Sequence, residues 1–181
     1  MFLGKNCITL TNLPTASGTA SASSTVEEPP YLSKNYAIDD SFNYHQLFTS
    51  HQEINPWYQL ELPEERMIHS VTIYTREDCC GENFHDIEVR AGFDNAEEWT
   101  NKQYQINQIN KQCDVFLSTP GEIGKHYEFN CINGSIEAKY ITIQVTSEQP
   151  GWLEMKEIEL EEHVCRGNYF WIHNNLVKDI Y

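Results

Sequence analysis

The sequence predicts an all-β fold, a two-sheet jelly roll of antiparallel strands that occupies about 150 residues as one domain. Short runs of alternating apolar and polar residues recur along the chain and are separated by turn-forming residues. The best helical segment, 96–104, is short. The length of 181 residues fits a single domain with a small excess at the ends. Together these observations favour a β-sandwich.

The alternating runs justify the strands individually. Val71 and Ile73 alternate with Thr72 and Tyr74, and the same alternation returns in 87–90 and 141–145. A period of two residues means that one face of a strand is buried and the other hydrated, which is typical of antiparallel strands in a sandwich. The expected strands, in chain order, are 57–62, 68–75, 86–91, 127–131, 140–145 and 155–160.

The two ends of the chain differ in composition from the middle. Residues 15–25 are rich in Ala, Ser and Thr, which fits either a linker or a closely packed edge strand. We expect the domain to span 1–165. Residues 166–181 then form a C-terminal tail, which either docks on the domain or begins a further module.

The charge balance restricts the partners. The chain has 12 basic and 27 acidic residues, a net charge of −15. Binding to nucleic acid or to an anionic membrane surface needs clustered Lys and Arg, so neither partner is expected. No segment approaches the ~20 apolar residues of a membrane span, so no membrane insertion is expected. An even number of cysteines, six, favours an extracellular protein. Residues 1–5 are too short and polar for a signal peptide.

The run 74–81, YTREDCCG, combines charge with sulfur. Its adjacent cysteines, Cys79 and Cys80, can pair with each other only by closing a small ring, which would present a rigid, apolar sulfur surface. Arg76 and Asp78 stand beside this surface. Charge next to an apolar plate suits a sugar, which carries hydroxyls on its edge and C–H groups on its face.

The sequence does not favour an enzyme. Ser50 and His51 are adjacent and cannot be aimed at each other as a catalytic triad requires, and no G-x-S-x-G elbow occurs. A zinc site is not expected either, because tetrahedral thiolate sites need two spaced pairs of ligands.

The motif Arg76-x-Asp78-Cys79-Cys80-Gly81, with the upstream His51 and the run NPWY at 55–58, resembles the F-type lectins, or fucolectins. These lectins share the discoidin, or coagulation-factor C-type, jelly roll. The resemblance covers about residues 7–165 and includes AIDD at 37–40 and EIEL at 157–160. It implies a discoidin-like β-sandwich with its binding loops at one end.

The resemblance also implies a fucose site. His51 and Arg76 would donate hydrogen bonds to the ring and hydroxyl oxygens of the sugar. The Cys79–Cys80 disulfide would pack against one face of the ring, and Asp78 would hold the arginine and the loop.

The resemblance assigns a role to two further residues and shows where this chain departs from the family. Tyr44 and His45 would meet the methyl group of fucose. The family carries a second Arg or Lys five residues after the aspartate, where this chain has Asn83. Thr49 and Lys156 stand where the family often has a pair of cysteines.

A calcium ion is implied in the same way, as a tie between the binding loops and the last strand. The matching positions are Asp39, Ser41 and Glu157, with main-chain oxygens near Tyr36 and Phe48. Such a cage needs six to eight oxygen ligands. The alternative is that 39–40 is a solvated acidic turn.

The remaining four cysteines allow three connectivities. Chain position favours Cys113–Cys131, a local loop worth about 3 kcal/mol, and Cys7–Cys165, a clamp between the first and last strands that resembles the discoidin arrangement.

Two functions follow. The first is a secreted lectin that binds fucosylated glycans in innate recognition or adhesion and gains avidity as a homo-oligomer. The second is a discoidin-like protein-interaction or adhesion module that lost sugar binding through Asn83.

Overall fold

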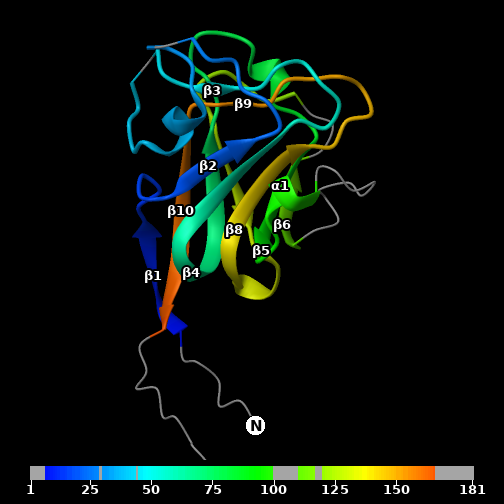
Figure 1. Cartoon of the computed structure of the whole chain (residues 1–181). Helices are drawn as coiled ribbons and strands as arrows, with labels where there is room; N and C mark the ends of the chain where they lie inside the picture. Colours follow the sequence, from blue (N-terminus) through cyan, green and yellow to red (C-terminus); the bar gives the residue numbers. More distant parts are fainter. Residues whose placement is uncertain (1–6, 29, 44, 100–109, 117–119, 166–181) are drawn as a thin grey trace, which may run out of the picture.

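The computed structural model describes residues 7–28, 30–43, 45–99, 110–116 and 120–165, which form an antiparallel β-sandwich (Figure 1). The strands are β1 (Cys7–Leu13), β2 (Thr19–Ala22), β3 (Phe48–Thr49), β4 (Trp57–Tyr74), β5 (Ile87–Gly92), β6 (Lys111–Phe116), β7 (His126–Asn130), β8 (Ile136–Val145), β9 (Glu154–Met155) and β10 (Glu157–Cys165). The helical segments are the short helix α1 (Ala96–Trp99) and the single turns η1 (Lys34–Ile38), η2 (Gly81–Asn83) and η4 (Ile132–Gly134).

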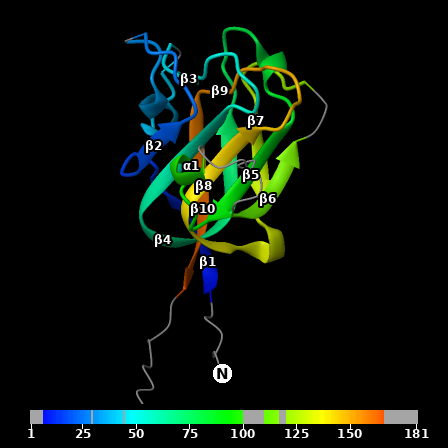
Figure 2. The same cartoon turned by 45° about the vertical axis from the view of Figure 1, so that its right-hand side comes forward.

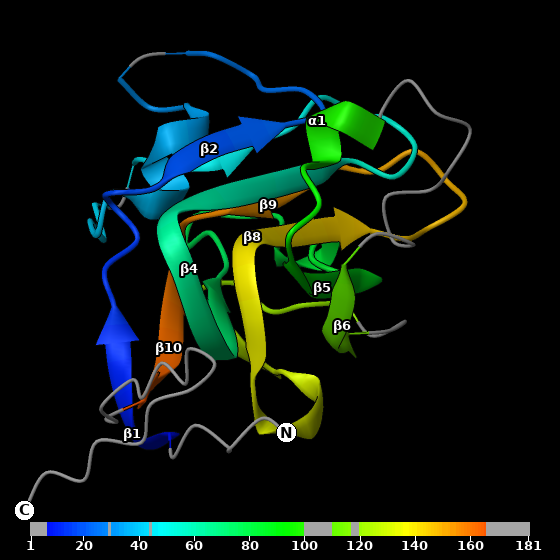
Figure 3. The same ribbon diagram turned by 60° about the horizontal axis from the view of Figure 1, so that its bottom comes forward.

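One long strand, β4, belongs to both layers of the sandwich. Its first part pairs with β2 and with the end of β8, and its last part pairs with β10 and β7. The β4–β8 register shifts between Glu61 and Arg66, and Figure 3 shows both strands bending there. Irregular pairing bends a strand, and Pro63, which has no N–H to donate, is tolerated there because the β4–β8 register is interrupted between Glu61 and Arg66. The expected strands 57–62 and 68–75 are therefore one bent strand.

The strands follow the order β1-β10-β4-β8-β5-β6, and all the named pairs are antiparallel. The two layers enclose a core whose largest fully buried side chains include Tyr58, Phe48, Leu60, Ile73 and Ile143. The rings of Phe48 and Tyr58 lie 4.8 Å apart between centroids. These findings confirm the predicted all-β jelly roll.

Most of the smaller predictions are also confirmed. The expected strands 86–91, 127–131 and 140–145 correspond to β5, β7 and the second half of β8, and 155–160 falls on β9 and β10. Within 15–25, β2 pairs with β4 as an edge strand. The helix expected over 96–104 begins as α1, and residues 100–104 lie outside the described part. The expected strands omitted β1 and β6, which end the sheet path and expose most of their described side chains at least in part.

Two of the predicted disulfides would join strands of the sandwich or their ends. Cys113 on β6 is bonded to Cys131, which follows β7. The register of β1 with β10 places Cys7 opposite Cys165, but the side chains of both residues lie outside the described part. The tail 166–181 lies outside it as well.

The β3–β9 pair defines one end of the sandwich. In both Figure 1 and Figure 2 it lies at the end opposite to the start of β1 and the finish of β10. Loops from both layers gather at this end, and they carry the motif residues. Among the described helices, none has the length and apolar character needed to cross a membrane.

Candidate functional site

The RxDCCG turn leaves β4 immediately after Tyr74 and is held by the loop 120–125. Thr75 donates from its amide to the carbonyl oxygen of Lys125 at 2.8 Å. Gly81 opens η2 against the same loop, and a Cβ atom there would lie 2.5 Å from the amide nitrogen of Ile123. Only glycine fits so close to a backbone. The turn therefore has a fixed position relative to the sandwich.

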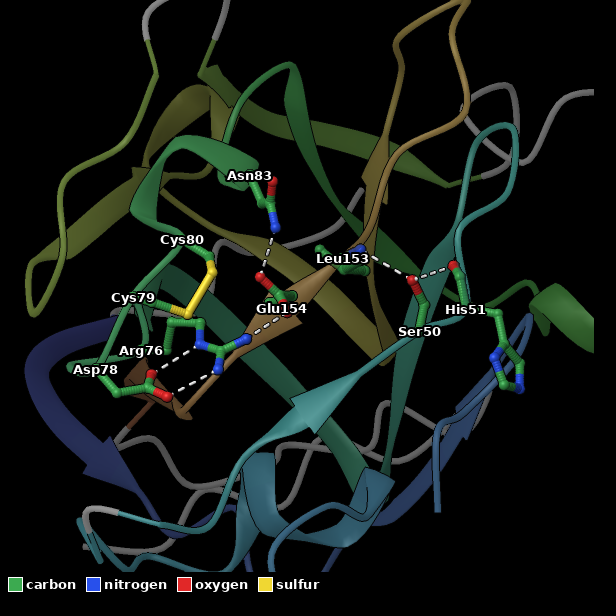
Figure 4. Close-up of polar contacts among 9 residues, drawn as sticks. All are labelled: Ser50, His51, Arg76, Asp78, Cys79, Cys80, Asn83, Leu153 and Glu154. Carbon is green, nitrogen blue, oxygen red and sulfur yellow. Dashed lines mark hydrogen bonds and ion pairs between the residues drawn. A yellow bond between two sulfur atoms is a disulfide. The ribbon is translucent and has the colours of Figure 1, made fainter. Parts of the chain in front are cut away.

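The predicted vicinal disulfide is formed within this turn, between Cys79 and Cys80. Cys80 has a left-handed backbone with φ of 61° and directly precedes η2. Both cysteines are half-buried, and Figure 4 shows the sulfur bridge beside the guanidinium of Arg76. The apolar plate and the cation thus lie side by side.

Arg76 makes a bidentate ion pair with Asp78. Its Nε donates to Oδ1 and its Nη2 to Oδ2 of Asp78, each at 2.8 Å. The hydrogen bonds from Arg76 lower the pKa of Asp78 to about 2, and those to Asp78 raise the pKa of the arginine further. A bidentate charged pair of this kind fixes orientation as well as charge. Asp78 thus holds the arginine, as the motif predicts.

Sequence reasoning missed a further member of the site, Glu154 on β9. Arg76 donates from Nη1 to Oε1 of Glu154 at 2.6 Å, and Asn83 donates from Nδ2 to Oε2 at 2.8 Å (Figure 4). Only 8% of Glu154 is exposed. One carboxylate therefore joins the arginine of the motif to the asparagine that replaces its second basic residue. We call Arg76, Asp78, the Cys79–Cys80 disulfide, Asn83 and Glu154 the Arg76 cluster.

The β3–β9 pair holds the backbone of Glu154. Thr49 lies directly opposite Glu154 in this antiparallel pair, so the two side chains share one face. Ser50 accepts from the amide of Leu153 through its Oγ, at 2.9 Å, and extends the pairing by one residue (Figure 4). The hydroxyl of Thr49 is buried without a hydrogen-bond partner in the described structure. The one signal for Glu154 in the sequence was an acidic residue between two apolar residues, Leu153 and Met155.

The structure does not bring His51 to this cluster. Its amide donates to Oγ of Ser24 at 3.0 Å, which fixes the backbone on the neighbouring loop. The side chain is exposed, and in Figure 4 the imidazole points away from Arg76 and the disulfide. His45 packs edge-on against Tyr31, with ring centroids 6.1 Å apart. Tyr44 lies outside the described residues.

Lys156 ties the turn to the last strands. It is only 3% exposed, and its Nζ lies 2.7 Å from Oε1 of Glu77, the residue between Arg76 and Asp78. The same Nζ lies 5.9 Å from the ring centroid of Phe42. This ion pair fastens the loop to the segment between β9 and β10.

The residues expected to hold calcium lie near one another. The amide of Ser41 donates both to Oδ1 of Asp39, at 2.9 Å, and to Oε2 of Glu157, at 3.1 Å. Glu157 is 1% exposed; burial, together with the charges of Asp39 and Asp40, raises its pKa to about 8. Two carboxylates that accept from the same amide, that of Glu157 buried and that of Asp39 half-buried, fit a hard cation that would neutralise them.

The other calcium candidates are main-chain groups. Tyr36 lies in η1, and Phe48 begins β3. Among the described residues, no three His, Cys, Asp or Glu side chains are grouped to hold a metal. A cation would therefore depend on backbone oxygens to complete its shell.

The cluster can donate and accept hydrogen bonds. A guanidinium has five N–H groups, and the three bonds above leave two of them for a ligand. The carboxylates of Asp78 and Glu154 retain lone pairs that can accept from hydroxyls. With the disulfide as an apolar surface, the site offers the contacts that a polyhydroxylated ring needs.

Comparison with known proteins identifies the family. The family model of the F5/8 type C domain matches residues 19–158. The chain belongs to the F5/8 type C domain family. Among curated relatives of this F5/8 type C domain, the fucolectin of Anguilla anguilla is 34% identical over 128 residues, which cover 68% of this chain and 73% of the eel protein.

Other relatives are longer than the shared region. Fucolectin-4 of Anguilla japonica is 31% identical over 120 residues, covering 65% of this chain and 59% of the relative. The pentraxin fusion protein of Xenopus laevis is 30% identical over 128 residues, covering 64% of this chain and 28% of the relative. The F5/8 type C domain thus matches only part of these proteins.

Solved structures share the fold. A fucolectin from the serum of striped bass, Morone saxatilis, superposes with a TM-score of 0.68 at 21% identity, covering 84% of this chain and 49% of the lectin. The lectin-binding domain of lectinolysin, as a histidine mutant complexed with Lewis b, gives a TM-score of 0.62 at 17% identity, covering 83% of this chain and 96% of that domain. These likenesses show that the F5/8 type C domain shares the sandwich fold of these two structures.

Proposed function

We propose that this F5/8 type C domain is a lectin that binds L-fucose or a related neutral sugar at the Arg76 cluster, without catalysis. The observation that carries the proposal is the oriented guanidinium of Arg76 beside the Cys79–Cys80 disulfide. A neutral sugar gains little from each exchanged hydrogen bond, so rigid and charged donors matter. The similarity to fucolectins supports the choice of sugar.

His51 has a conditional part in this proposal. Its backbone is fixed, but its side chain is exposed and can change rotamer. Rotation toward the Arg76 cluster would add a second nitrogen donor to the sugar. Tyr44 and His45 remain the proposed contacts of the methyl group.

Calcium is the proposed structural cofactor. Asp39 and Glu157, with Ser41 and main-chain oxygens near Tyr36 and Phe48, would hold the ion. It would neutralise the two carboxylates and tie the 39–48 loop to β10. No part of sugar recognition is assigned to the ion itself.

We further propose an extracellular location and a role in glycan recognition or adhesion. Two disulfides are formed in the described structure, and disulfides persist in oxidising compartments. The serum source of the striped bass lectin is consistent with this. A homo-oligomer would raise the weak affinity of single sugar sites. The net charge of −15 disfavours nucleic acid as a partner.

A glycan array tests the proposal. The domain, in calcium, is expected to bind fucosylated glycans and to lose binding to the same glycans after fucosidase treatment. Equal binding before and after treatment would contradict fucose recognition.

One observation favours the alternative of an interaction module without sugar binding. Asn83 lacks the charge and reach of a second basic residue. Glu154 already accepts hydrogen bonds from Asn83 and from one nitrogen of Arg76. In this view Glu154 blocks the donors, whereas in the lectin view it positions them and accepts a sugar hydroxyl.

Glu154→Ala separates these views because they predict opposite signs. The lectin proposal predicts an affinity for L-fucose about tenfold lower, since one charged hydrogen bond and the restraint on Arg76 are lost. The blocking view predicts that affinity appears or rises. Calorimetric titration with L-fucose measures the affinity of the variant and of the wild-type domain. Glu128→Ala, which removes an exposed carboxylate on β7, is the matched control and is expected to change nothing.

A further inference from the structure

We propose that Asn133 is a site of N-linked glycosylation and carries an oligosaccharide at the end of the sandwich away from the Arg76 cluster. The chain has one Asn-x-Ser/Thr tripeptide, Asn133-Gly134-Ser135, and its middle residue is not proline. Such tripeptides also occur by chance, so the way in which the structure presents this one decides whether it can carry a glycan. This inference rests on the proposed extracellular location and does not depend on sugar binding.

The tripeptide begins on the turn η4, between β7 and β8. Asn133 and Gly134 both have left-handed backbones, with φ of 62° and 87°, and both residues are exposed. Within the described part of the chain, the carboxamide of Asn133 makes no hydrogen bond. Beyond the chain neighbours of Gly134, no described atom lies within 4 Å of the position that a Cβ atom would take there. The amide nitrogen of Asn133 is therefore accessible and unengaged.

The turn alone does not account for a free carboxamide. A pair of left-handed residues favours Asn followed by Gly, which explains the two residue types. An asparagine that serves only a turn commonly hydrogen-bonds to the nearby backbone through its side chain, and Asn133 does not. The backbone is held by other groups instead. The amide of Cys131 donates to the carbonyl oxygen of His69 at 2.8 Å, and the imidazole of His69 hydrogen-bonds to the carbonyl oxygen of Gly134.

The turn lies far from the proposed sugar site. β7 starts opposite Tyr74, the residue that leads into the RxDCCG turn, and ends opposite Ser70. At about 3.3 Å per residue, this step of four residues takes the chain about 13 Å away from the RxDCCG turn before η4 begins. In Figure 1 the turn before β8 lies at the end of the sandwich opposite to β3 and β9. A glycan at Asn133 thus leaves the Arg76 cluster open to ligands.

The modification is a group transfer from a lipid-linked oligosaccharide diphosphate. Nδ2 of Asn133 forms a bond to C1 of the first sugar, and the bond between C1 and the diphosphate oxygen breaks. Nδ2 gives up one proton, and the lipid diphosphate leaves. The transferase must also reach the hydroxyl of Ser135, which in the folded domain is hydrogen-bonded to Nδ1 of His163. Transfer therefore precedes the folding of this turn.

Mass spectrometry of the protein from its natural source tests the site. The peptide that contains Asn133 is expected to carry a glycan that peptide N-glycosidase removes. Release in heavy-oxygen water is expected to convert Asn133 to a labelled aspartate. The label distinguishes release of a glycan from spontaneous deamidation of the Asn-Gly pair.

Variants secreted from a eukaryotic cell assign the glycan to this residue. Asn133→Gln and Ser135→Ala are expected to lose the whole glycosidase-sensitive mass increase, and Ser135→Thr is expected to keep it. Ser135→Ala leaves the left-handed Asn133 in place, so its loss of the glycan does not come from a strained turn. Asn130→Gln is the matched control, an exposed asparagine outside any Asn-x-Ser/Thr tripeptide, and is expected to keep the mass increase.

Two results would overturn the inference. They are an unmodified Asn133 in the natural protein and a glycosidase-sensitive mass increase that survives in Asn133→Gln. Titration of the same preparations with L-fucose tests the lectin proposal separately. A domain that binds L-fucose but carries no glycan overturns only the glycosylation site, and a glycosylated domain that binds no sugar overturns only the lectin.

Discussion

Arg76→Ala is expected to lower the affinity for L-fucose at least a hundredfold while the domain stays folded. The substitution removes the charged donor beside the disulfide, and each charged hydrogen bond to a ligand is worth about 1.5–3 kcal/mol. Two N–H groups of Arg76 remain for the sugar, so about 3 kcal/mol or more is lost. Calorimetric titration with L-fucose measures the change.

The same substitution has a smaller effect on stability. It deprives Glu154 of one partner in a buried setting, which costs about 1–3 kcal/mol. Thermal unfolding followed by circular dichroism is expected to show a cooperative transition at a lower Tm. Arg66→Ala, on the bend of β4, is the matched control and should retain binding. Unchanged affinity in Arg76→Ala would place the sugar site elsewhere on the domain.

Calcium is expected to raise the Tm of the domain by about 5–10 °C. An ion that binds only the folded state, at a concentration about 100 times its Kd, stabilises that state by about 2.7 kcal/mol. For a domain of this size, each kcal/mol shifts Tm by about 2–4 °C. Differential scanning calorimetry with calcium and with a chelator measures the shift.

Glu157→Gln is the variant that links this shift to the proposed site. It removes the carboxylate that would bind the ion but keeps the shape and most hydrogen bonds, so it is expected to abolish the calcium response. Glu159→Gln, two residues further along β10 and exposed, should keep the response. A calcium shift that survives in Glu157→Gln would locate the ion elsewhere, and no shift in the wild-type domain would remove calcium from the account.

The fold could be predicted because its strands alternate. Val71 and Ile73 face the core while Thr72 and Tyr74 face outward, and such alternation reports a half-buried strand locally. The continuity of β4 through Pro63 could not be seen in this way. Charged residues with a proline look like a turn, and only pairing on both sides shows that the strand bends and continues.

The candidate site was predictable only in part for a similar reason. Arg76, Asp78 and the two cysteines lie within five residues of each other, so the motif itself brings them together. Glu154 is distant in sequence and comes near Arg76 because β10 pairs with the end of β4, where Glu157 lies opposite Tyr74. Asn83 could be named as a departure from the family, but its hydrogen bond to Glu154 needed the structure. His51 lies in a loop, and the alternation of apolar and polar residues does not determine where a loop side chain points.

Titration of the wild-type domain with L-fucose in calcium tests the lectin account most directly. L-galactose, which carries a hydroxyl in place of one hydrogen of the methyl group of fucose, is the matched sugar. The account predicts saturable binding of L-fucose to one site, with a Kd in the millimolar range or tighter, and weaker binding of L-galactose. No heat of binding for L-fucose at millimolar concentrations would contradict it.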